Sequence, residues 1–551
     1  MMKNRILKIH QDDNVIVALS DLKAEESVSW EGTEYFLLEN INTKHKFAIQ
    51  DFQEGDLIKM YGVVIGKATK PILKGQAITT QNIKHQTNEY VKKNREVQWQ
   101  APEVSRWQDK TFLGYHRKDG KVGTANYWIV IPLVFCENRN ILTIQKILEK
   151  ELGYDTGVSY EIDVQNLVTA YQEGKSAEEI LAINVLEKKD LSRQKRTFPN
   201  VDGIKFLTHQ GGCGGTRQDA DALCALLAGY INNPNVAGAT VLSLGCQNAQ
   251  IDILKKYLEL FSPDIAKPVF FLEQQKSLSE KEFIAEAVKK TFVGLIEANK
   301  TSRQPASLSK LVVGLECGGS DGFSGISANP TLGYASDLLV ALGGTAVLAE
   351  FPELNGVEQE LVNRCLTEAS AAKFMQLMHT YNQKAKAVGS GFEMNPSPGN
   401  IKDGLITDAM KSAGAAKKGG TSPITDVLDY TEQITKSGLN LLCTPGNDVE
   451  STTALAGSGV NLIVFTTGLG TPTGNPIVPT IKVSSNTQLF RKMNDIIDFD
   501  AGTVITGEDS IESRGADLLD FIIQVASGKI TPKAVQLKQD DFIPWKRGIS
   551  L

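Results

Sequence analysis

The sequence lacks the features that mark several large classes of protein. No uninterrupted apolar run approaches the ~20 residues needed to cross a bilayer, and the first ten residues have no apolar centre of the signal-peptide kind. The lysines and arginines form no basic stripe, and the formal net charge is −6, which argues against a nucleic-acid surface. We therefore expect neither a membrane nor a nucleic acid as a partner.

Cysteine is scarce, and nucleotide-binding motifs are missing. The seven cysteines include no CxxC pair, so a zinc-finger knuckle is excluded. Their odd number and wide spacing do not fit a disulfide framework and favour a reducing compartment, so we expect a cytoplasmic protein. The sequence has neither a P-loop ending in Lys-Ser/Thr nor a GxGxxG with its acidic partner, which argues against nucleotide binding.

The 551 residues exceed what one hydrophobic core organises, and the sequence patterns divide the chain. Residues 1–88 alternate apolar and polar positions between glycine turns, which predicts a small all-β domain, and 89–110 form a polar linker. Residues 111–300 and 301–551 alternate strand and helix patterns, which predicts mainly parallel sheets. The expected fold class is α/β, with a small N-terminal all-β domain followed by an α/β catalytic body.

Three stretches share one layout, in which an apolar run is followed by a cysteine and then by glycine or a side-chain amide. The cysteines are Cys213, Cys246 and Cys317. Each run has the length and β-branched content of a buried strand. Groups just past the carboxyl ends of such strands converge on the ligand crevice of an open α/β sheet. The shared layout therefore predicts a metal or catalytic site.

His209 precedes Cys213 by four residues on the same expected loop. Alone, a histidine is more often structural, and a buried cysteine is usually a small hydrophobic residue. The pair beside two glycines favours a functional site, and thiolate and imidazole suit zinc or iron. Among the other cysteines, Cys136 ends another strand pattern, whereas Cys224 and Cys365 lie in helical patterns typical of core residues.

Two further segments carry polar or glycine-rich patterns. Residues 114–126 place dense polar side chains before a strand, although a plain hairpin turn explains Asp119-Gly120 by itself. Residues 468–474 form a glycine-rich loop after a strand. Backbone N–H groups in such a loop suit an anion, for example a carboxylate.

Together these motifs resemble the altronate/galactarate dehydratase family over nearly the whole chain. The N-terminal residues resemble the SAF-type β domain of that family, and segment 316–330 is a highly specific match. Segments 440–448 and 543–551 look closer to the altronate branch than to the galactarate branch. Further matches are Gly120–Thr124, His209, Gly212-Cys213, Gly245-Cys246, Glu350, 395–400, 466–472 and 498–502.

The resemblance implies a hydro-lyase that removes water from a sugar acid with Fe²⁺ or Mn²⁺. Its product would be a 2-keto-3-deoxy acid such as 2-dehydro-3-deoxygluconate. A base must take the weakly acidic Cα proton, and an acid must help the β-hydroxyl leave. His209 is the first candidate, because the pKa of an imidazole lies near the working pH, and Glu350 is the second.

The resemblance leaves the metal ligands open. Cys213, Cys246 and Cys317 could ligate the metal directly or hold an iron–sulfur cluster with one open iron site, and their spacing does not separate these alternatives. His10 and His45 could instead supply nitrogen ligands if the N-terminal domain folds over the site as a lid. A contact between subunits of a homo-oligomer is an equally open role for that domain.

The substrate is expected to be a small sugar acid. Three cations of the family pattern are replaced here by Ala125, Ile401 and Leu469, which favours a monocarboxylic acid of the altronate kind. Lys44 stands where the family pattern has glycine, and Gln247 stands where it has an acidic residue. The substrate-binding residues that the resemblance indicates are Arg117, Asn126, Ser320, Asp321, Asn329, Asn400, Thr467, Gly468 and Thr471.

Two alternatives to an altronate dehydratase stay open. A lyase for galactarate or another 2-hydroxy acid, such as a sulfonated analogue, would keep the same residues. A non-catalytic sugar-acid binding protein would keep the anion-binding loops but would not need the aligned thiols.

Overall fold

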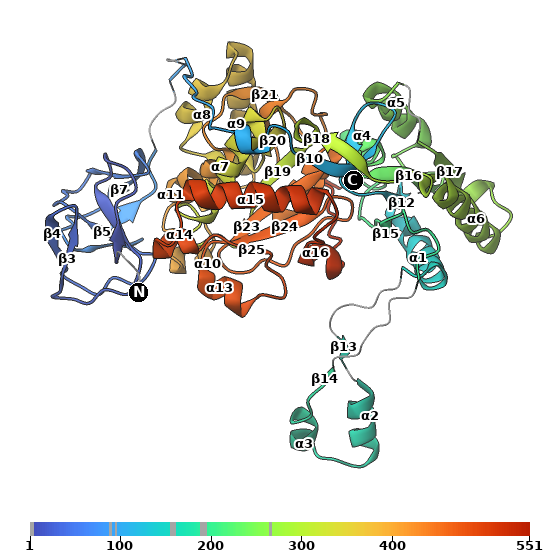
Figure 1. Ribbon diagram of the computed structural model, residues 1–551, viewed down its shortest axis with the longest axis horizontal. Coiled ribbons are helices and arrows are strands. Elements are labelled where there is room, and N and C mark those ends of the chain that lie inside the picture. Colours follow the sequence, from blue (N-terminus) through green and yellow to red (C-terminus); the bar gives the residue numbers. More distant parts are fainter. Residues whose placement is uncertain are drawn as a thin grey trace.

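The computed structural model describes residues 5–87, 91–93, 96–154, 161–162, 164–187, 195–263 and 267–550. Figure 1 shows three bodies in a row, with the N-terminal domain at one end and the C-terminal domain in the middle. The expected boundary between residues 88 and 89 lies outside the described residues. In the described part of the chain, no helix is long and apolar enough to cross a membrane.

The N-terminal domain consists of short antiparallel strands around one small core of its own, and its remaining buried residues join the core of the C-terminal domain. One sheet has the order β1-β2-β5-β8, a second has the order β6-β7-β9, and β3 pairs with β4. Alternation within β6, where Ile58 and Met60 are buried between more exposed neighbours, turns one face inward. The strands are β1 (Ile6–Leu7), β2 (Val15–Ala18), β3 (Ser27–Trp30), β4 (Thr33–Phe36), β5 (Lys46–Ala48), β6 (Leu57–Met60), β7 (Val63–Ala68), β8 (Ala77–Ile78) and β9 (Ile83–Lys84).

The second domain is built on a parallel sheet of four strands in the order β15-β12-β16-β17. Every residue of β12 and β16 is buried, as expected for central strands covered on both faces. Helices α1 and α6 share one core with the sheet, and α4 and α5 share another. These elements are β12 (Tyr127–Pro132), α1 (Asn138–Leu152), β15 (Gly203–Phe206), α4 (Arg217–Asn232), β16 (Val236–Ser243), α5 (Ile251–Phe261), β17 (Val269–Glu273) and α6 (Glu280–Ala298).

Two smaller groups of elements accompany the second domain. A three-stranded antiparallel sheet, ordered β11-β10-β18, contacts α15 of the C-terminal domain. A helical hairpin with a short two-stranded ribbon projects away from the body (Figure 1). The elements are β10 (Thr111–His116), β11 (Val122–Gly123), β18 (Gln304–Ser307), α15 (Ile511–Ala526), β13 (Glu161–Ile162), α2 (Val164–Gln172), α3 (Ala177–Leu181) and β14 (Leu186–Glu187).

The C-terminal domain carries a parallel sheet of seven strands in the order β21-β22-β20-β19-β23-β24-β25. This sheet and the small N-terminal β domain confirm the expected fold class. The strands are β19 (Val312–Cys317), β20 (Thr345–Leu348), β21 (Ile424–Leu428), β22 (Gly438–Leu442), β23 (Leu462–Thr467), β24 (Thr480–Ser484) and β25 (Phe499–Asp500).

Helices cover both faces of the seven-stranded sheet. Helices α7 and α15 pack on one face, and α12 packs on the other together with α4 of the second domain. The second and C-terminal domains therefore share one core. The helices are α7 (Ala328–Ala341), α8 (Glu358–Arg364), α9 (Glu368–Ala387), α10 (Pro398–Lys402), α11 (Asp408–Ala415), α12 (Asp448–Gly457), α13 (Thr487–Lys492), α14 (Thr503–Thr506) and α16 (Lys533–Gln536).

The strand order fixes where a ligand crevice can form. After β19 the chain continues to β20 on one side, whereas β23 lies on the other side of β19 and leads on to β24. Such a change of direction opens a crevice beyond the carboxyl ends of the strands. The loops after β19 and β23 carry Ser320, Asp321, Gly468 and Thr471.

Candidate active site

Asp321 is the centre of the loop cluster at this sheet edge. Its carboxylate is fully buried and accepts hydrogen bonds from the hydroxyl groups of Ser485 (2.8 Å) and Ser324 (2.9 Å). The backbone of Gly468 passes so close that a Cβ at this position would lie 2.3 Å from Asp321 Cγ. Only glycine fits there without displacement, so the sequence of the β23 loop is matched to Asp321.

Lysines of the N-terminal domain contact this cluster. Lys44 Nζ lies 2.9 Å from Asp321 Oδ2 and 3.1 Å from Asp403 Oδ1. Lys44 has φ +73°, a left-handed conformation that favours glycine. The fully buried Lys46 donates to the carbonyl oxygen of Gly404 (2.7 Å), and burial lowers its pKa to about 7. The N-terminal domain thus brings two lysines to the edge of the seven-stranded sheet.

The two histidines of the N-terminal domain lie in different environments. His45 Nε2 is 3.0 Å from the carbonyl oxygen of Lys402, and burial lowers the pKa of its imidazole. His10 is exposed, and its Nδ1 accepts a hydrogen bond from the backbone N–H of Asp12. Among the described residues, neither belongs to a group of three closely spaced metal-ligating side chains.

Seven of the nine expected substrate-binding residues gather around the loops after β19 and β23. The Ser320 carbonyl accepts from Asn400 Nδ2 (2.8 Å), and Thr467 Oγ1 accepts from the N–H groups of Gly470 and Thr471. The gathered residues are Ser320, Asp321, Asn329, Asn400, Thr467, Gly468 and Thr471.

Arg117 and Asn126 lie elsewhere. Arg117 donates to Asn126 Oδ1 (2.9 Å) and to the carbonyl of Pro234 (2.7 Å), and burial lowers the pKa of its guanidinium to about 10. Asn126 also donates to two backbone carbonyls at the amino end of β12. These bonds tie together loops of the second domain at the end of its sheet opposite to the carboxyl edge. The structure therefore does not bring Arg117 and Asn126 to the other seven residues.

A buried cluster of a thiol, carboxylates and lysines lies at the end of β19, four residues before Asp321. Lys418 Nζ is 2.5 Å from Glu350 Oε2 and 2.8 Å from Cys317 Sγ. Cys317 Sγ is 3.1 Å from Glu353 Oε2, and Lys411 Nζ is 2.7 Å from Glu353 Oε1. All five side chains are largely or fully enclosed, so opposite charges must balance inside the protein.

Burial controls protonation in this cluster. It raises the pKa of Cys317 and of Glu350, and the neighbouring Glu353 raises that of Glu350 further. Burial alone would raise the pKa of Glu353 as well. The ammonium groups of Lys411 and Lys418 outweigh this effect, so the pKa of Glu353 lies below its usual value. Strongly perturbed groups gathered at a ligand crevice are typical of active sites.

Glu350 combines this protonation behaviour with backbone strain. It has φ +65° at the end of β20, a conformation that costs a non-glycine residue ~1–3 kcal/mol. Its Oε2 accepts from the N–H of Cys317 as well as from Lys418, whereas its buried Oε1 has no hydrogen-bond partner among the described residues. Strain of this kind is kept where the surrounding structure requires a defined side-chain position.

The acidic clusters of this domain do not fit a divalent metal ion. Cys317, Glu350 and Glu353 place their ligand atoms within 4.8 Å of one another. However, the ammonium of Lys418 already contacts Cys317 and Glu350. A metal ion bound by the same two side chains would lie next to this ammonium and would be repelled by it. The same argument applies to Asp321, which holds Lys44. In both places a lysine supplies the positive charge that a metal ion would otherwise supply.

His209 is held by both of its ring nitrogens. Nδ1 accepts from the N–H of Gly211 (3.0 Å), so Nε2 carries the proton and donates to the carbonyl of Pro132 (2.8 Å). Burial lowers its pKa to about 4. Neither nitrogen is free to exchange a proton with a substrate, and we interpret His209 as a residue that positions the turn leading to Cys213.

The structure does not bring the three expected cysteines together. Cys317 is buried in the C-terminal domain, whereas Cys213 and Cys246 are exposed on loops of the second domain. Cys213 instead shares its sheet edge with Cys246 and Cys136. Cys224, Cys365 and Cys443 are buried.

Models of one protein family match the chain in three consecutive segments. They are described as the altronate/galactarate dehydratase SAF domain (residues 4–86), the second domain of D-galactarate dehydratase/altronate hydrolase (114–299) and the C-terminal domain of D-galactarate/altronate dehydratase (308–550). The altronate dehydratase of Bacillus subtilis (strain 168) is 34% identical over 549 residues, which cover 99% of each chain. The chain belongs to the altronate/galactarate dehydratase family.

Other curated members of this family give the same assignment. The altronate dehydratase of Escherichia coli (strain K12) is 33% identical over 95% of this chain and 96% of its own. The galactarate dehydratase (L-threo-forming) of the same organism is 32% identical over 95% of this chain and 93% of its own. These relatives are hydro-lyases, and they confirm the family expected from the motifs.

Sequence reasoning missed part of this dehydratase-family site. Lys418 lies in the run Ala415-Ala-Lys-Lys-Gly-Gly420, where nothing distinguishes it from Lys417. Glu353 could have been found, because it follows the expected Glu350 by three residues. Lys44 stands out in the sequence only as a departure from the family pattern, and its partner Asp321 belongs to another domain.

Proposed function

We propose that the protein is a hydro-lyase that removes water from an altronate-like sugar acid and releases a 2-keto-3-deoxy acid such as 2-dehydro-3-deoxygluconate. The proposal rests on the buried Cys317–Glu350–Lys418 cluster, four residues before Asp321. The cluster lies at the end of β19, from which the chain adds strands on one side and later on the other. A binding protein without catalytic activity has no need for a strained carboxylate held against a buried lysine.

The cluster supplies the groups that the elimination needs. A base must take the Cα proton, and an acid must protonate the departing β-hydroxyl. Glu350 has a raised pKa and one oxygen without a described hydrogen-bond partner, which suits a base. Burial raises the pKa of the half-buried Asp448 to about 7, near the optimum for proton transfer at neutral pH. Asp448 also approaches the turn at Gly318, directly after Cys317.

Lysines can stabilise the negative charge that develops during the reaction. Lys482 is fully buried, its ammonium lies over the ring of Phe465 (3.5 Å), and its Nζ has no hydrogen-bond partner among the described residues. Burial lowers its pKa to about 7. A cation placed in advance near an enediolate or carboxylate lowers the barrier without reorganisation.

The preference for a monocarboxylic acid rests on two of the three replaced cations. Leu469 is partly exposed in the loop after β23, and Ile401 packs half-buried in α10. Ala125 is buried at the amino end of β12, so it does not bear on the substrate. Lys44 restores one ammonium near Ile401, and this observation favours a dicarboxylic or sulfonated 2-hydroxy acid as the second candidate.

A panel of C5 and C6 aldonates and aldarates, assayed for 2-keto-3-deoxy product, tests the proposal. We expect the highest kcat/KM for altronate, with a lower value for galactarate. A kcat/KM for galactarate well above that for altronate would reverse the choice of substrate. Absence of product from every member, with folded protein, would contradict a sugar-acid dehydratase.

A dependence on Fe²⁺ or Mn²⁺ is part of the proposal, because the family resemblance implies it. The two acidic clusters of the C-terminal domain do not fit this ion, since each holds a lysine. We therefore expect iron to bind elsewhere, and of the ligands that the resemblance indicated Cys213, Cys246, His10 and His45 remain.

A further inference from the structure

Cys136, Cys213 and Cys246 follow three neighbouring strands of the second domain. They come after β12, β15 and β16, which are adjacent in the sheet order β15-β12-β16. All three thiols are exposed, whereas the other four cysteines are buried. Because free cysteine is among the residue types most often buried, three exposed thiols at one sheet edge need an explanation other than packing.

Hydrogen bonds hold the three cysteine loops against one another. The N–H of Phe135, next to Cys136, donates to the carbonyl of Gly211 (3.1 Å). The N–H of Asn248, two residues after Cys246, donates to the carbonyl of Gly212 (2.9 Å), next to Cys213. The sheet and these bonds therefore fix the three loops relative to one another.

Glycines allow this close approach. Gly212 has φ +96°, and a Cβ there would lie 2.1 Å from the carbonyl oxygen of Leu133. Gly245, directly before Cys246, has φ +121°. The left-handed backbone and the absence of a side chain are both needed at these positions, so each of these two cysteines is delivered by a specifically shaped turn.

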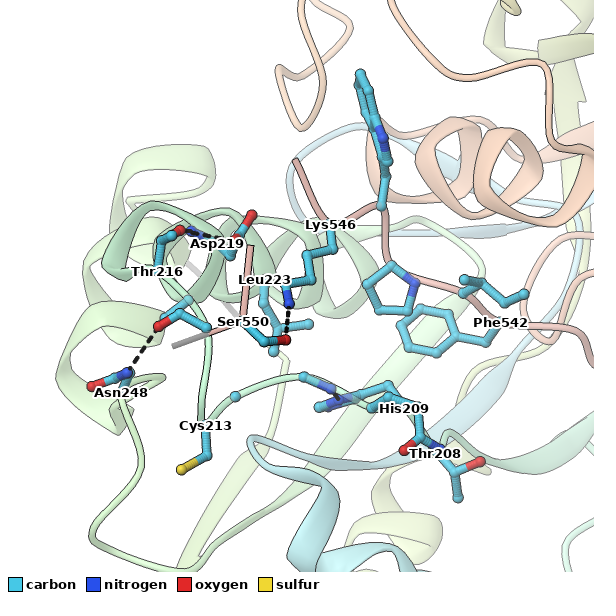
Figure 2. A pocket seen from close by; sticks show the side chains of 18 of the residues that line it. Thr208, His209, Cys213, Thr216, Asp219, Leu223, Asn248, Phe542, Lys546 and Ser550 are labelled. Atoms are coloured by element: carbon cyan, nitrogen blue, oxygen red, sulfur yellow. Dashed lines mark hydrogen bonds between the residues drawn. The ribbon is translucent and has the colours of Figure 1, made fainter. Parts of the chain in front are cut away.

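The thiols are open to a ligand, and no lysine or arginine among the described residues is bonded to them. A cavity of about 400 Å³ adjoins Cys213 and is also lined by His209, Asn248 and Lys546. Figure 2 shows the thiol of Cys213 directed away from Lys546 and Ser550. In the part of the chain that the structure describes, no ion pair or hydrogen bond engages the thiols of Cys136, Cys213 or Cys246, in contrast to Cys317 with its lysine.

The three thiols do not form a ready-made site for a single metal ion. A tetrahedral ion with metal–sulfur bonds of ~2.3 Å brings its ligand sulfurs within ~4 Å of one another. These three thiols are not among the described groups whose ligand atoms lie within 4.8 Å. An iron–sulfur cluster binds cysteine thiolates through separate iron atoms and therefore spans a wider triangle.

We propose that Cys136, Cys213 and Cys246 bind an iron–sulfur cluster through three thiolates. Each thiol loses its proton on binding. The fourth iron of a cubane cluster would then have no cysteine ligand from this set. The inference concerns the second domain alone and does not rest on the substrate proposed for the C-terminal domain.

Anaerobic reconstitution of the full-length protein with ferrous and ferric iron, sulfide and a thiol reductant tests this proposal. We expect bound iron and acid-labile sulfide in equal amounts, with the broad visible absorption of an iron–sulfur cluster. Cys136→Ser, Cys213→Ser and Cys246→Ser should each lose most of the labile sulfide and the absorption. Cys317→Ser and Cys365→Ala should keep both, because these thiols lie outside the set.

Alkylation mapped by mass spectrometry gives a second measurement on the unchanged chain. The thiols of Cys136, Cys213 and Cys246 should react in the cluster-free protein and be protected after reconstitution. The proposal is overturned if the reconstituted protein binds no sulfide, if it binds only a single metal ion, or if the triple serine variant keeps the cluster. Turnover of altronate is assayed separately, so failure of the substrate assignment leaves these results readable.

Discussion

The ammonium of Lys44, in the N-terminal domain, lies 2.9 Å from the buried carboxylate of Asp321 in the C-terminal domain. This ion pair crosses a domain boundary and joins a turn of the β domain to the loop after β19. Asp321 has no exposed side-chain surface, so its charge depends on Lys44 and on the hydroxyl donors around it. The N-terminal domain thus completes the site electrostatically.

Replacing Lys44 should weaken the site and the domain contact together. Removal of one partner from a buried ion pair costs about 3–5 kcal/mol, so Lys44→Met should lower the free energy of unfolding and reduce kcat/KM for the sugar acid at least tenfold. Lys44→Gly should destabilise less, because glycine relieves the strain at φ +73°. Urea unfolding and steady-state kinetics measure both effects, and Lys23→Met at an exposed position is the control. Equal stability of the three variants would show that the ion pair between Lys44 and Asp321 does not stabilise the protein.

His209 should determine stability at low pH and not proton transfer. Its pKa is about 4 in the folded protein and ~6.5 in the unfolded chain. Because the folded pKa is the lower one, the stabilisation is present above pH ~6.5 and is lost as pH falls towards 4, by roughly 3 kcal/mol. His209→Gln should flatten the pH dependence of urea unfolding in this window and should slow turnover less than tenfold. A variant slowed by roughly two to four orders of magnitude would instead identify His209 as an acid or base.

Gly468 should tolerate no side chain. A methyl group at this position would meet Asp321 Cγ at 2.3 Å, so Gly468→Ala must displace either the carboxylate or the loop after β23. We expect at least a tenfold loss of kcat/KM. Gly399→Ala in α10 is the matched control, because its nearest neighbour is 3.6 Å away. Similar kinetics for the two variants would show that the Asp321 loop is not part of the site.

The sequence patterns predicted the parallel sheets, because apolar runs followed by glycine turns reflect local constraints on buried strands. They also placed Cys317, Asp321 and Thr467 at strand ends, where the structure has them. They could not separate Cys317 from Cys213, since both follow the same local pattern and only strand order assigns them to different sheets.

Contacts between segments far apart in the chain could not be predicted from the sequence. Lys418 reaches Glu350 and Cys317 from a short helical turn after α11, and no periodicity links these positions. The locked tautomer of His209 depends on the Pro132 carbonyl at the end of another strand. Residue type alone makes His209 the first candidate for proton transfer, and only its partners show that both nitrogens are engaged.

Turnover of altronate by Lys418→Met, compared with Lys417→Met, tests the location of the active site most directly. Lys418 is 1% exposed and bonded to Glu350 and Cys317, whereas the adjacent Lys417 has no described contact with the cluster. Circular dichroism and urea unfolding establish that each variant is folded, and Lys418→Arg retains the charge if the methionine variant is unstable. We expect at least a hundredfold loss of kcat for Lys418→Met and near-native turnover for Lys417→Met. A folded Lys418→Met variant with near-native kcat would show that the buried cluster is not the active site.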